Sequence, residues 1–139
     1  MRIIALGRLS SDYQRLVQEL LKQIPLELIE LKDYQSSVYL DKEAQSILSY
    51  LSEKDFVVTL EIEGSMLSTN QLVEFIDNNI HNITFVIGSS FGLSDKIKSR
   101  ANYHLSLSKN TFSHAIARLL LVEQIYRYYM IRKNHPYHK

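Results

Sequence analysis

Cysteine and tryptophan are absent from this 139-residue chain, and glycine and proline are scarce, with four and two residues. The absence of cysteine excludes disulfide bonds and metal sites with thiolate ligands. No apolar stretch approaches the roughly 18–20 residues that span a bilayer, and the N-terminal apolar run is too short for a signal peptide, so we expect a cytoplasmic protein. With so few breaking residues, we expect one domain over residues 1–139, with short connections.

The charged residues are divided unevenly along the chain. Residues 96–139 hold nine of the sixteen Lys and Arg residues and one of the fifteen acidic residues, whereas residues 1–95 hold the other seven bases and fourteen acids. A basic end on an acidic body indicates a polyanionic partner, and nucleic acid is the first candidate. The alternative is a helical surface that happens to be basic.

Short apolar stretches alternate with helical patterns through the whole sequence. Strands are expected at residues 2–6, 26–31, 56–62, 83–87 and 103–107, and helices at residues 11–24, 41–52, 94–99 and 113–133, with one more beginning at Ser68. The stretch at 83–87 is apolar throughout, as expected for a central strand. This alternation predicts an α/β fold with a mostly parallel sheet and helices on both faces.

Two helix starts carry the spacing of a capping box, in which two side chains each satisfy a backbone N–H of the other residue. Ser11 is followed by Gln14, and Ser68 by Gln71. Gly64 is expected to end the third strand, because glycine weakens a strand interior.

Three loops, after residues 62, 87 and 107, leave carboxyl ends of strands and are expected to be neighbours around a ligand. In the second loop Gly88 and Gly92 would let the backbone approach that ligand, although no Walker or GxGxxG pattern is complete and a plain turn is the alternative. Residues 105–112 could hold an anion or an adenosine at the start of the last helix. Ordinary capping by Thr111 or Ser113 would explain the same residues.

None of the five histidines has the spacing of a metal site, so no metal is expected. His81 is expected on a surface loop, His104 on a strand and His114 in the first turn of the last helix. Glu61 and Glu63 share one face of a strand, which favours a solvated strand edge.

The last helix has apolar residues on more than one face, which favours contact with a second copy of the chain over a deep core of one chain. Glu123 and Arg127 have the spacing of a helical ion pair; if buried, that pair could instead orient Arg127 toward a phosphate or a base. After the helix, Tyr137, His138 and Lys139 could stack on a base, hydrogen-bond to it and pair with phosphate. A frayed end is the alternative.

Several of these segments, taken in order, resemble the RlmH family of SPOUT-class methyltransferases. They are Val-Thr-Leu-Glu-Ile-Glu-Gly at 58–64, Phe-Val-Ile-Gly at 85–88 with Gly-Leu at 92–93, residues 105–112 with His114, Arg118 with Val-Glu-Gln-Ile-Tyr-Arg at 122–127, and the terminal Tyr-His-Lys. The resemblance is strong from residue 56 to the end and recognisable at residues 1–31.

The resemblance implies an S-adenosylmethionine-dependent enzyme that methylates ring nitrogen three of a pseudouridine in 23S ribosomal RNA of the large subunit. It also implies a SPOUT fold with a C-terminal trefoil knot, a homodimer, and a tail that completes the partner's site. The donor would be bound by Leu60, Gly88, Leu107, Ser108, Lys109, Asn110, Thr111 and Phe112. The RNA would be bound by Arg127, Tyr137, His138 and Lys139. His138 is also the candidate general base, with RNA binding alone as the alternative.

Three departures from the family pattern stand out. Ser89 replaces a second glycine, Ser113 stands where a proline is common, and the connection at 33–40 is shorter. Because none of these removes a reactive group, we expect donor affinity to be tuned and not abolished. A non-enzymatic RNA-binding or ribosome-assembly module and a flavodoxin-like nucleotide binder are the alternative functions.

Overall fold

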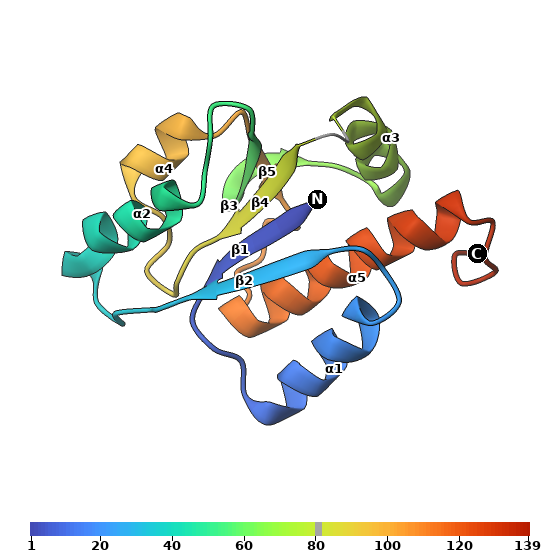
Figure 1. The fold of residues 1–139 in the computed structure, drawn as a ribbon, viewed down its shortest axis with the longest axis horizontal. Helices are drawn as coiled ribbons and strands as arrows, with labels where there is room; N and C mark the ends of the chain where they lie inside the picture. Colours follow the sequence, from blue (N-terminus) through green and yellow to red (C-terminus); the bar gives the residue numbers. More distant parts are fainter. Residues whose placement is uncertain (80–81) are drawn as a thin grey trace.

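The computed structural model describes residues 1–79 and 82–139, so the expected loop position of His81 lies outside the described residues. Within them, strands and helices alternate along the chain (Figure 1). The strands are β1 (Arg2–Leu6), β2 (Glu27–Leu31), β3 (Phe56–Met66), β4 (Ile83–Ile87) and β5 (Tyr103–Ser106). The α-helices are α1 (Ser11–Leu21), α2 (Leu40–Ser49), α3 (Thr69–Asn79), α4 (Asp95–Arg100) and α5 (His114–Arg132), and the short 3-10 helix η1 (Ser37–Tyr39) precedes α2.

The strands form one parallel sheet in the order β2-β1-β4-β3-β5. Helices α2 and α4 cover one face, and α1, α3 and α5 pack against the other (Figure 1). Strand β4 lies in the centre and every residue in it is buried, as its apolar sequence predicts. The expected α/β fold, with helices on both faces of a parallel sheet, is confirmed. No helix among residues 1–79 and 82–139 combines the length and apolarity needed to cross a membrane.

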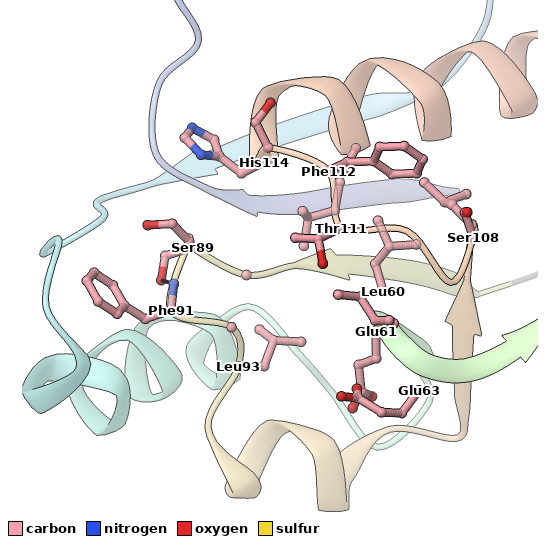
Figure 2. A pocket seen from close by; sticks show the side chains of 18 of the residues that line it. Leu60, Glu61, Glu63, Ser89, Phe91, Leu93, Ser108, Thr111, Phe112 and His114 are labelled. Carbon is pink, nitrogen blue, oxygen red and sulfur yellow. Dashed lines mark hydrogen bonds between the residues drawn. The ribbon is translucent and has the colours of Figure 1, made fainter.

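The two hydrophobic cores follow from the two-residue period of the strands. In β1, Ile3 and Ala5 face the core under α1 and α5, whereas Ile4 and Leu6 face the core under α2 and α4. Because β1 is apolar on both faces, it must lie where helices cover both faces of the sheet. At the carboxyl ends of the strands, Leu60 of β3 and Thr111 of the segment before α5 come close together (Figure 2).

One capping box forms and the other does not. The Ser68 hydroxyl accepts from the N–H of Gln71 at 3.1 Å, and the Gln71 amide oxygen accepts from the N–H of Ser68 at 2.8 Å. The prediction for Ser11 and Gln14 is wrong. Ser10 occupies the N-cap position of α1 without a side-chain cap, and its carbonyl accepts from the Gln14 N–H at 2.9 Å.

Gly64 does not end the third strand, which continues to Met66. Instead the pairing with β5 shifts: both Leu60 and Ser65 pair with Leu105. A Cβ on Gly64 would lie 2.6 Å from the His104 carbonyl oxygen, so only glycine allows the two backbones to lie this close. The glycine therefore marks an irregularity within the strand pair, as in a β-bulge, and not the end of the strand.

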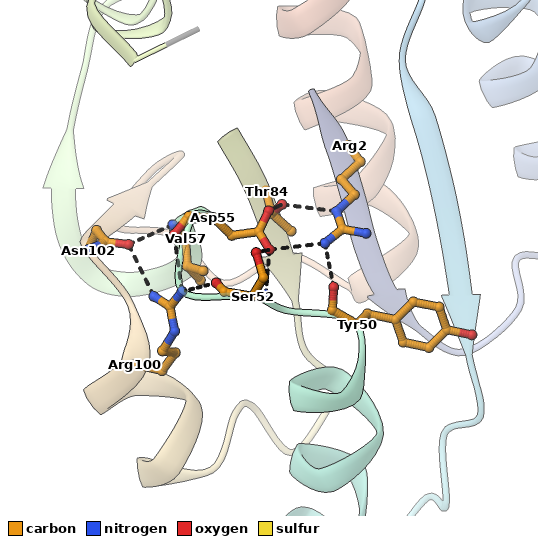
Figure 3. Close-up of polar contacts among 8 residues, drawn as sticks. All are labelled: Arg2, Tyr50, Ser52, Asp55, Val57, Thr84, Arg100 and Asn102. Carbon is orange, nitrogen blue, oxygen red and sulfur yellow. Dashed lines mark hydrogen bonds and ion pairs between the residues drawn. The ribbon is translucent and has the colours of Figure 1, made fainter. Parts of the chain in front are cut away.

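Polar side chains join β1, β4 and α4 to the connection before β3, at the amino ends of the strands (Figure 3). The Asp55 carboxylate accepts from the Ser52 N–H at 2.7 Å and from the Thr84 hydroxyl at 3.1 Å, and pairs with Arg2 at 3.3 Å. Arg100 donates to the carbonyl oxygens of Ser52 and Asp55 at 2.7 and 3.1 Å. These contacts hold the edge of the sheet opposite the loops that follow β3, β4 and β5.

We expect Asp55→Asn to destabilise the fold by about 1–3 kcal/mol, because an amide cannot accept all of these bonds. Burial alone would raise the pKa of Asp55, but hydrogen bonds from Ser52 and Thr84 and the charge of Arg2 lower it below the ordinary 3.8. A carboxylate with a lowered pKa stabilises the fold above pH 3.8 and loses this contribution as the pH falls through the folded-state pKa.

Urea unfolding from about pH 2.5 to about pH 7 measures this contribution, because this range spans the titration of an aspartate. The difference in unfolding free energy between wild type and Asp55→Asn should be largest at neutral pH and shrink in acid. A difference that stays constant across this range would contradict the assignment.

Candidate functional site

A cavity of about 640 Å³ opens at the carboxyl ends of β4 and β5, beside residues 60–63 of β3 (Figure 2). Its walls are residues 60–63, residues 87–93, and the segment from Leu107 to the first turn of α5, together with Lys98 of α4. The loops after β4 and β5 are neighbours, as expected, but the expected loop after residue 62 is wrong, because residues 60–63 belong to β3, which continues to Met66. Because β3 lies between β4 and β5 in the sheet, the three carboxyl ends are adjacent although they are far apart in sequence.

Most of the expected donor-binding residues meet in this cavity. Seven of them line it: Leu60, Gly88, Leu107, Ser108, Asn110, Thr111 and Phe112. Lys109 is exposed and does not line it. The placement of these residues fits a common ligand, while their contact with a particular donor stays a prediction.

The loop after β4 is a tight turn. The Gly92 N–H donates to the Ser89 carbonyl at 2.9 Å, and Gly92 has a φ of +84°. A Cβ on Gly88 would lie 2.5 Å from the Gly92 carbonyl oxygen, so a side chain there would force the turn apart. The turn itself therefore requires both glycines. Because they have no side chains, the turn also brings bare backbone to the cavity wall. A plain turn and a loop that a ligand can approach are thus compatible interpretations of these glycines.

Glu43 of α2 lies behind this turn with its side chain buried. One carboxylate oxygen, Oε2, accepts from the Tyr34 N–H at 3.0 Å, whereas the other, Oε1, is buried without a hydrogen-bond partner among the residues that the structure describes. Burial raises the pKa of Glu43, the Asp33 charge raises it further, and the bonds from Tyr34 and Ser89 only partly oppose this. Because its pKa is raised, Glu43 contributes stability to the fold that is fully present below pH 4.5 and is lost as the pH rises through the folded-state pKa.

The loop between β5 and α5 both caps the helix and forms part of the cavity wall. The Ser113 hydroxyl accepts from the Ile116 N–H at 3.3 Å and caps α5, as the alternative interpretation expected. The Asn110 N–H donates to the Ser108 hydroxyl at 3.0 Å, which folds the loop so that Ser108, Asn110 and Thr111 line the cavity. Capping therefore accounts for Ser113 and leaves the residues before it available to a ligand.

Sequence reasoning missed the polar wall formed by Glu61, which is not a solvated strand edge. Its side chain is 12% exposed; it accepts from the Thr59 hydroxyl at 2.5 Å, contacts His104 and lies 3.8 Å from the Lys98 ammonium. His104 and Lys98 come from β5 and α4, so only the strand order could have revealed this cluster. Glu63 is exposed at the cavity rim, as expected.

Arg118 ties the start of α5 to the sheet. It is completely buried, donates to the carbonyl oxygens of Leu6 and Gly7 at 3.0 and 2.9 Å, and pairs with Glu30 at 2.6 Å. Leu6 and Glu30 belong to β1 and β2, so this one side chain positions α5, and with it the preceding loop, against the carboxyl ends of two strands. Spacing alone contained no signal for this role.

The expected RNA-binding residues lie at the other end of α5. The pair between Glu123 and Arg127 forms as expected, and the Tyr137 hydroxyl donates to Glu123 at 2.9 Å. The Arg127 guanidinium lies 4.7 Å from the centre of the Tyr137 ring, and its Nη1 is 3.2 Å from His138 Nδ1. The cavity lining extends along α5 to Ala117, and Arg127 lies ten residues further on, so this cluster is separated from the cavity by roughly 15 Å of helix at 1.5 Å per residue.

Across the part of the chain that the structure describes, no group of three or more His, Asp or Glu side chains is arranged to hold a metal ion.

Comparisons with known proteins agree with this architecture. A family model described as "Predicted SPOUT methyltransferase" matches residues 1–138. The chain is 41% identical to "Ribosomal RNA large subunit methyltransferase H" of Acholeplasma laidlawii, over 99% of this chain and 98% of that protein. The protein of the same name from Clostridium botulinum is 37% identical over the same shares of the two chains.

Among solved structures, a "probable methylase family protein" from Haemophilus influenzae aligns with a TM-score of 0.59 over 99% of this chain and 70% of that one. At 16% identity it supports the fold alone. The match of the family model to nearly the whole chain, together with relatives of this identity and coverage, shows that the chain belongs to the SPOUT methyltransferase family.

Proposed function

We propose that this protein transfers a methyl group from S-adenosylmethionine to ring nitrogen three of a pseudouridine in 23S ribosomal RNA, in the cytoplasm. The observation that carries the proposal is the cavity formed by residues 60–63 of β3 and the loops after β4 and β5, in a member of a methyltransferase family. The names of the relatives point to RNA of the large ribosomal subunit as the substrate.

The residues present fit this donor. Leu60, Leu107 and Phe112 supply apolar surface for an adenosine, and the bare backbone at Gly88 allows close approach. The carboxylate of Glu63 at the rim adds negative potential that suits a sulfonium and an ammonium group. S-adenosylmethionine supplies an already activated methyl group, so the work of the protein is to hold donor and base in line and to exclude water.

The separation along α5 supports a homodimer. The tail is held against Glu123 and Arg127, and Arg127 lies roughly 15 Å of helix beyond the last cavity residue of α5, so the tail would have to give up these contacts to reach the cavity of its own chain. A second copy could place its tail there. The outer faces of α1 and α5 also carry exposed apolar side chains, at Leu16, Ile116 and Leu120. We therefore propose that α5 contributes to the dimer interface, and that the segment after β5 forms the C-terminal trefoil knot implied by the family resemblance.

Arg127, Tyr137, His138 and Lys139 then form the RNA-binding group of this proposal. The nitrogen that accepts the methyl must lose its proton, and His138 is the candidate base. However, His138 Nδ1 faces an Arg127 nitrogen that can only donate, so a neutral His138 carries its proton on Nε2. This geometry favours binding over proton abstraction as the role of His138.

Mass spectrometry of 23S RNA tests the proposal directly. A strain without this gene should lack the methyl group on one pseudouridine, and expression of the wild-type chain should restore it. Calorimetry on the purified protein should show S-adenosylmethionine binding. An unchanged methylation pattern would contradict the reaction, and absent donor binding would favour a non-enzymatic assembly module.

A further inference from the structure

The ring of Phe91 is 50% exposed at the mouth of the cavity, at the tip of the turn after β4. One exposed apolar side chain is ordinary by itself. This one differs because it lines the cavity that the function requires, on the side opposite Glu61 and Glu63 (Figure 2). Among the described residues, the aromatic ring pairs involve other side chains, so the faces of Phe91 are not occupied by another ring.

The turn holds Phe91 in place from behind. Its N–H donates to the Ser89 hydroxyl at 3.3 Å, and the Ser89 carbonyl accepts from Gly92 across the turn. Ser89 is itself buried, so the turn is anchored in the protein interior. An aromatic ring on a rigid, supported turn loses little conformational freedom when a flat ligand binds to it.

The position of the ring decides which ligand it meets. Gly88, Leu107, Ser108 and residues 110–112 form the inner wall, where the donor is proposed to bind, whereas Phe91 lies at the opening. The opposite rim carries carboxylates, which disfavour phosphate. A neutral, flat group entering from outside fits this place better than the RNA backbone does, and enzymes that act on a base extrude it and stack it on aromatic side chains.

We propose that Phe91 is a specificity-determining residue that stacks on the target base of the RNA and aligns its ring nitrogen with the methyl group of the donor. The assignment rests on the proposed function, because it requires a nucleobase as methyl acceptor. It adds a residue of the chain's own cavity to the RNA-binding group, which otherwise lies on the tail.

The test compares Phe91→Ala, Phe91→Leu and Phe91→Tyr, with Tyr50→Ala as a control that removes an exposed aromatic ring elsewhere on the molecule. Transfer of labelled methyl groups to large ribosomal subunits from a strain without the gene gives kcat/KM for the RNA. Calorimetry gives the Kd for S-adenosylmethionine. Base stacking is sequence-tolerant and depends on the aromatic face, so Phe91→Tyr preserves the interaction while Phe91→Leu keeps only apolar volume.

We expect Phe91→Ala to lower kcat/KM by roughly 10- to 100-fold, with Phe91→Leu close to Phe91→Ala and both Phe91→Tyr and Tyr50→Ala within about twofold of wild type. The Kd for the donor should stay within about twofold in all variants, because stacking on the acceptor leaves donor contacts intact. Leucine as effective as phenylalanine, or donor affinity that weakens in parallel with kcat/KM, would overturn the assignment. A wild-type protein that transfers no methyl group would overturn the proposed function itself, and this assignment with it.

Discussion

Two inactive variants of this protein should restore activity when they are combined in one dimer. The first is Gly88→Ala, in which the new Cβ would lie 2.5 Å from the Gly92 carbonyl oxygen and disrupt the cavity wall. The second lacks residues 135–139 and so has no tail to offer. Each alone should lose at least about 100-fold in kcat/KM, because correct positioning of donor and acceptor supplies most of the proposed catalysis.

In a mixed dimer, the intact cavity of the tail-deleted chain meets the intact tail of the Gly88→Ala chain. One of the two sites is then complete. If chains exchange freely, half of the dimers are mixed, so activity should return to about a quarter of the wild-type value. The measurement is methyl transfer after the two variants are unfolded and refolded together, with differently tagged chains to confirm mixed dimers.

Two controls separate the possible causes. Calorimetry should show that Gly88→Ala loses donor affinity while the tail-deleted chain keeps it, and circular dichroism should show that both variants are folded. Mixed dimers without activity would mean that the tail acts on the cavity of its own chain, and an active tail-deleted chain would mean that the tail has no role. That result would remove the tail from the proposed site and leave the fold and the family assignment untouched.

Replacement of Arg118 by methionine should cause a large loss of stability. The guanidinium is completely buried, donates hydrogen bonds to two carbonyl oxygens and forms an ion pair with Glu30. Removal of one member of a buried ion pair commonly costs about 3–5 kcal/mol, because the remaining polar groups stay buried without partners. Since Glu30 is 27% exposed and can recover some hydration, we expect about 3 kcal/mol by urea unfolding at pH 7.

The pair Arg118→Met with Glu30→Gln forms the matched comparison. If the loss comes from an unpaired charge, the double variant should be more stable than the sum of the two single changes predicts, with a coupling of roughly 1–2 kcal/mol. A loss below about 1 kcal/mol for Arg118→Met would show that α5 is held by its apolar contacts alone. Donor binding offers a second measurement, because Arg118 also positions the segment that precedes α5.

The sequence alone determined the features that depend on neighbouring residues. It predicted the alternation of strands and helices and the buried strand β4. It also predicted the capping box at Ser68 and Gln71 and the turn between Gly88 and Gly92. Each depends on a spacing of two to four residues, or on the conformational freedom of one glycine. The meeting of the loops after β4 and β5 also followed, because parallel strands bring their carboxyl ends to one edge, although the third wall is part of β3 and not a loop.

The tertiary structure decided what depends on strand order and on the length of α5. Glu61 meets His104 and Lys98 because β5 pairs with β3, which no local pattern contains. Gly64 lies inside a strand because β5 shifts its register beside it. Lys109, although within the predicted segment, lies outside the cavity lining because its neighbours fold around the Ser108 hydroxyl. The contacts of Tyr137 and His138 with Glu123 and Arg127 hold the tail against the C-terminal half of α5, away from the cavity at the start of this helix.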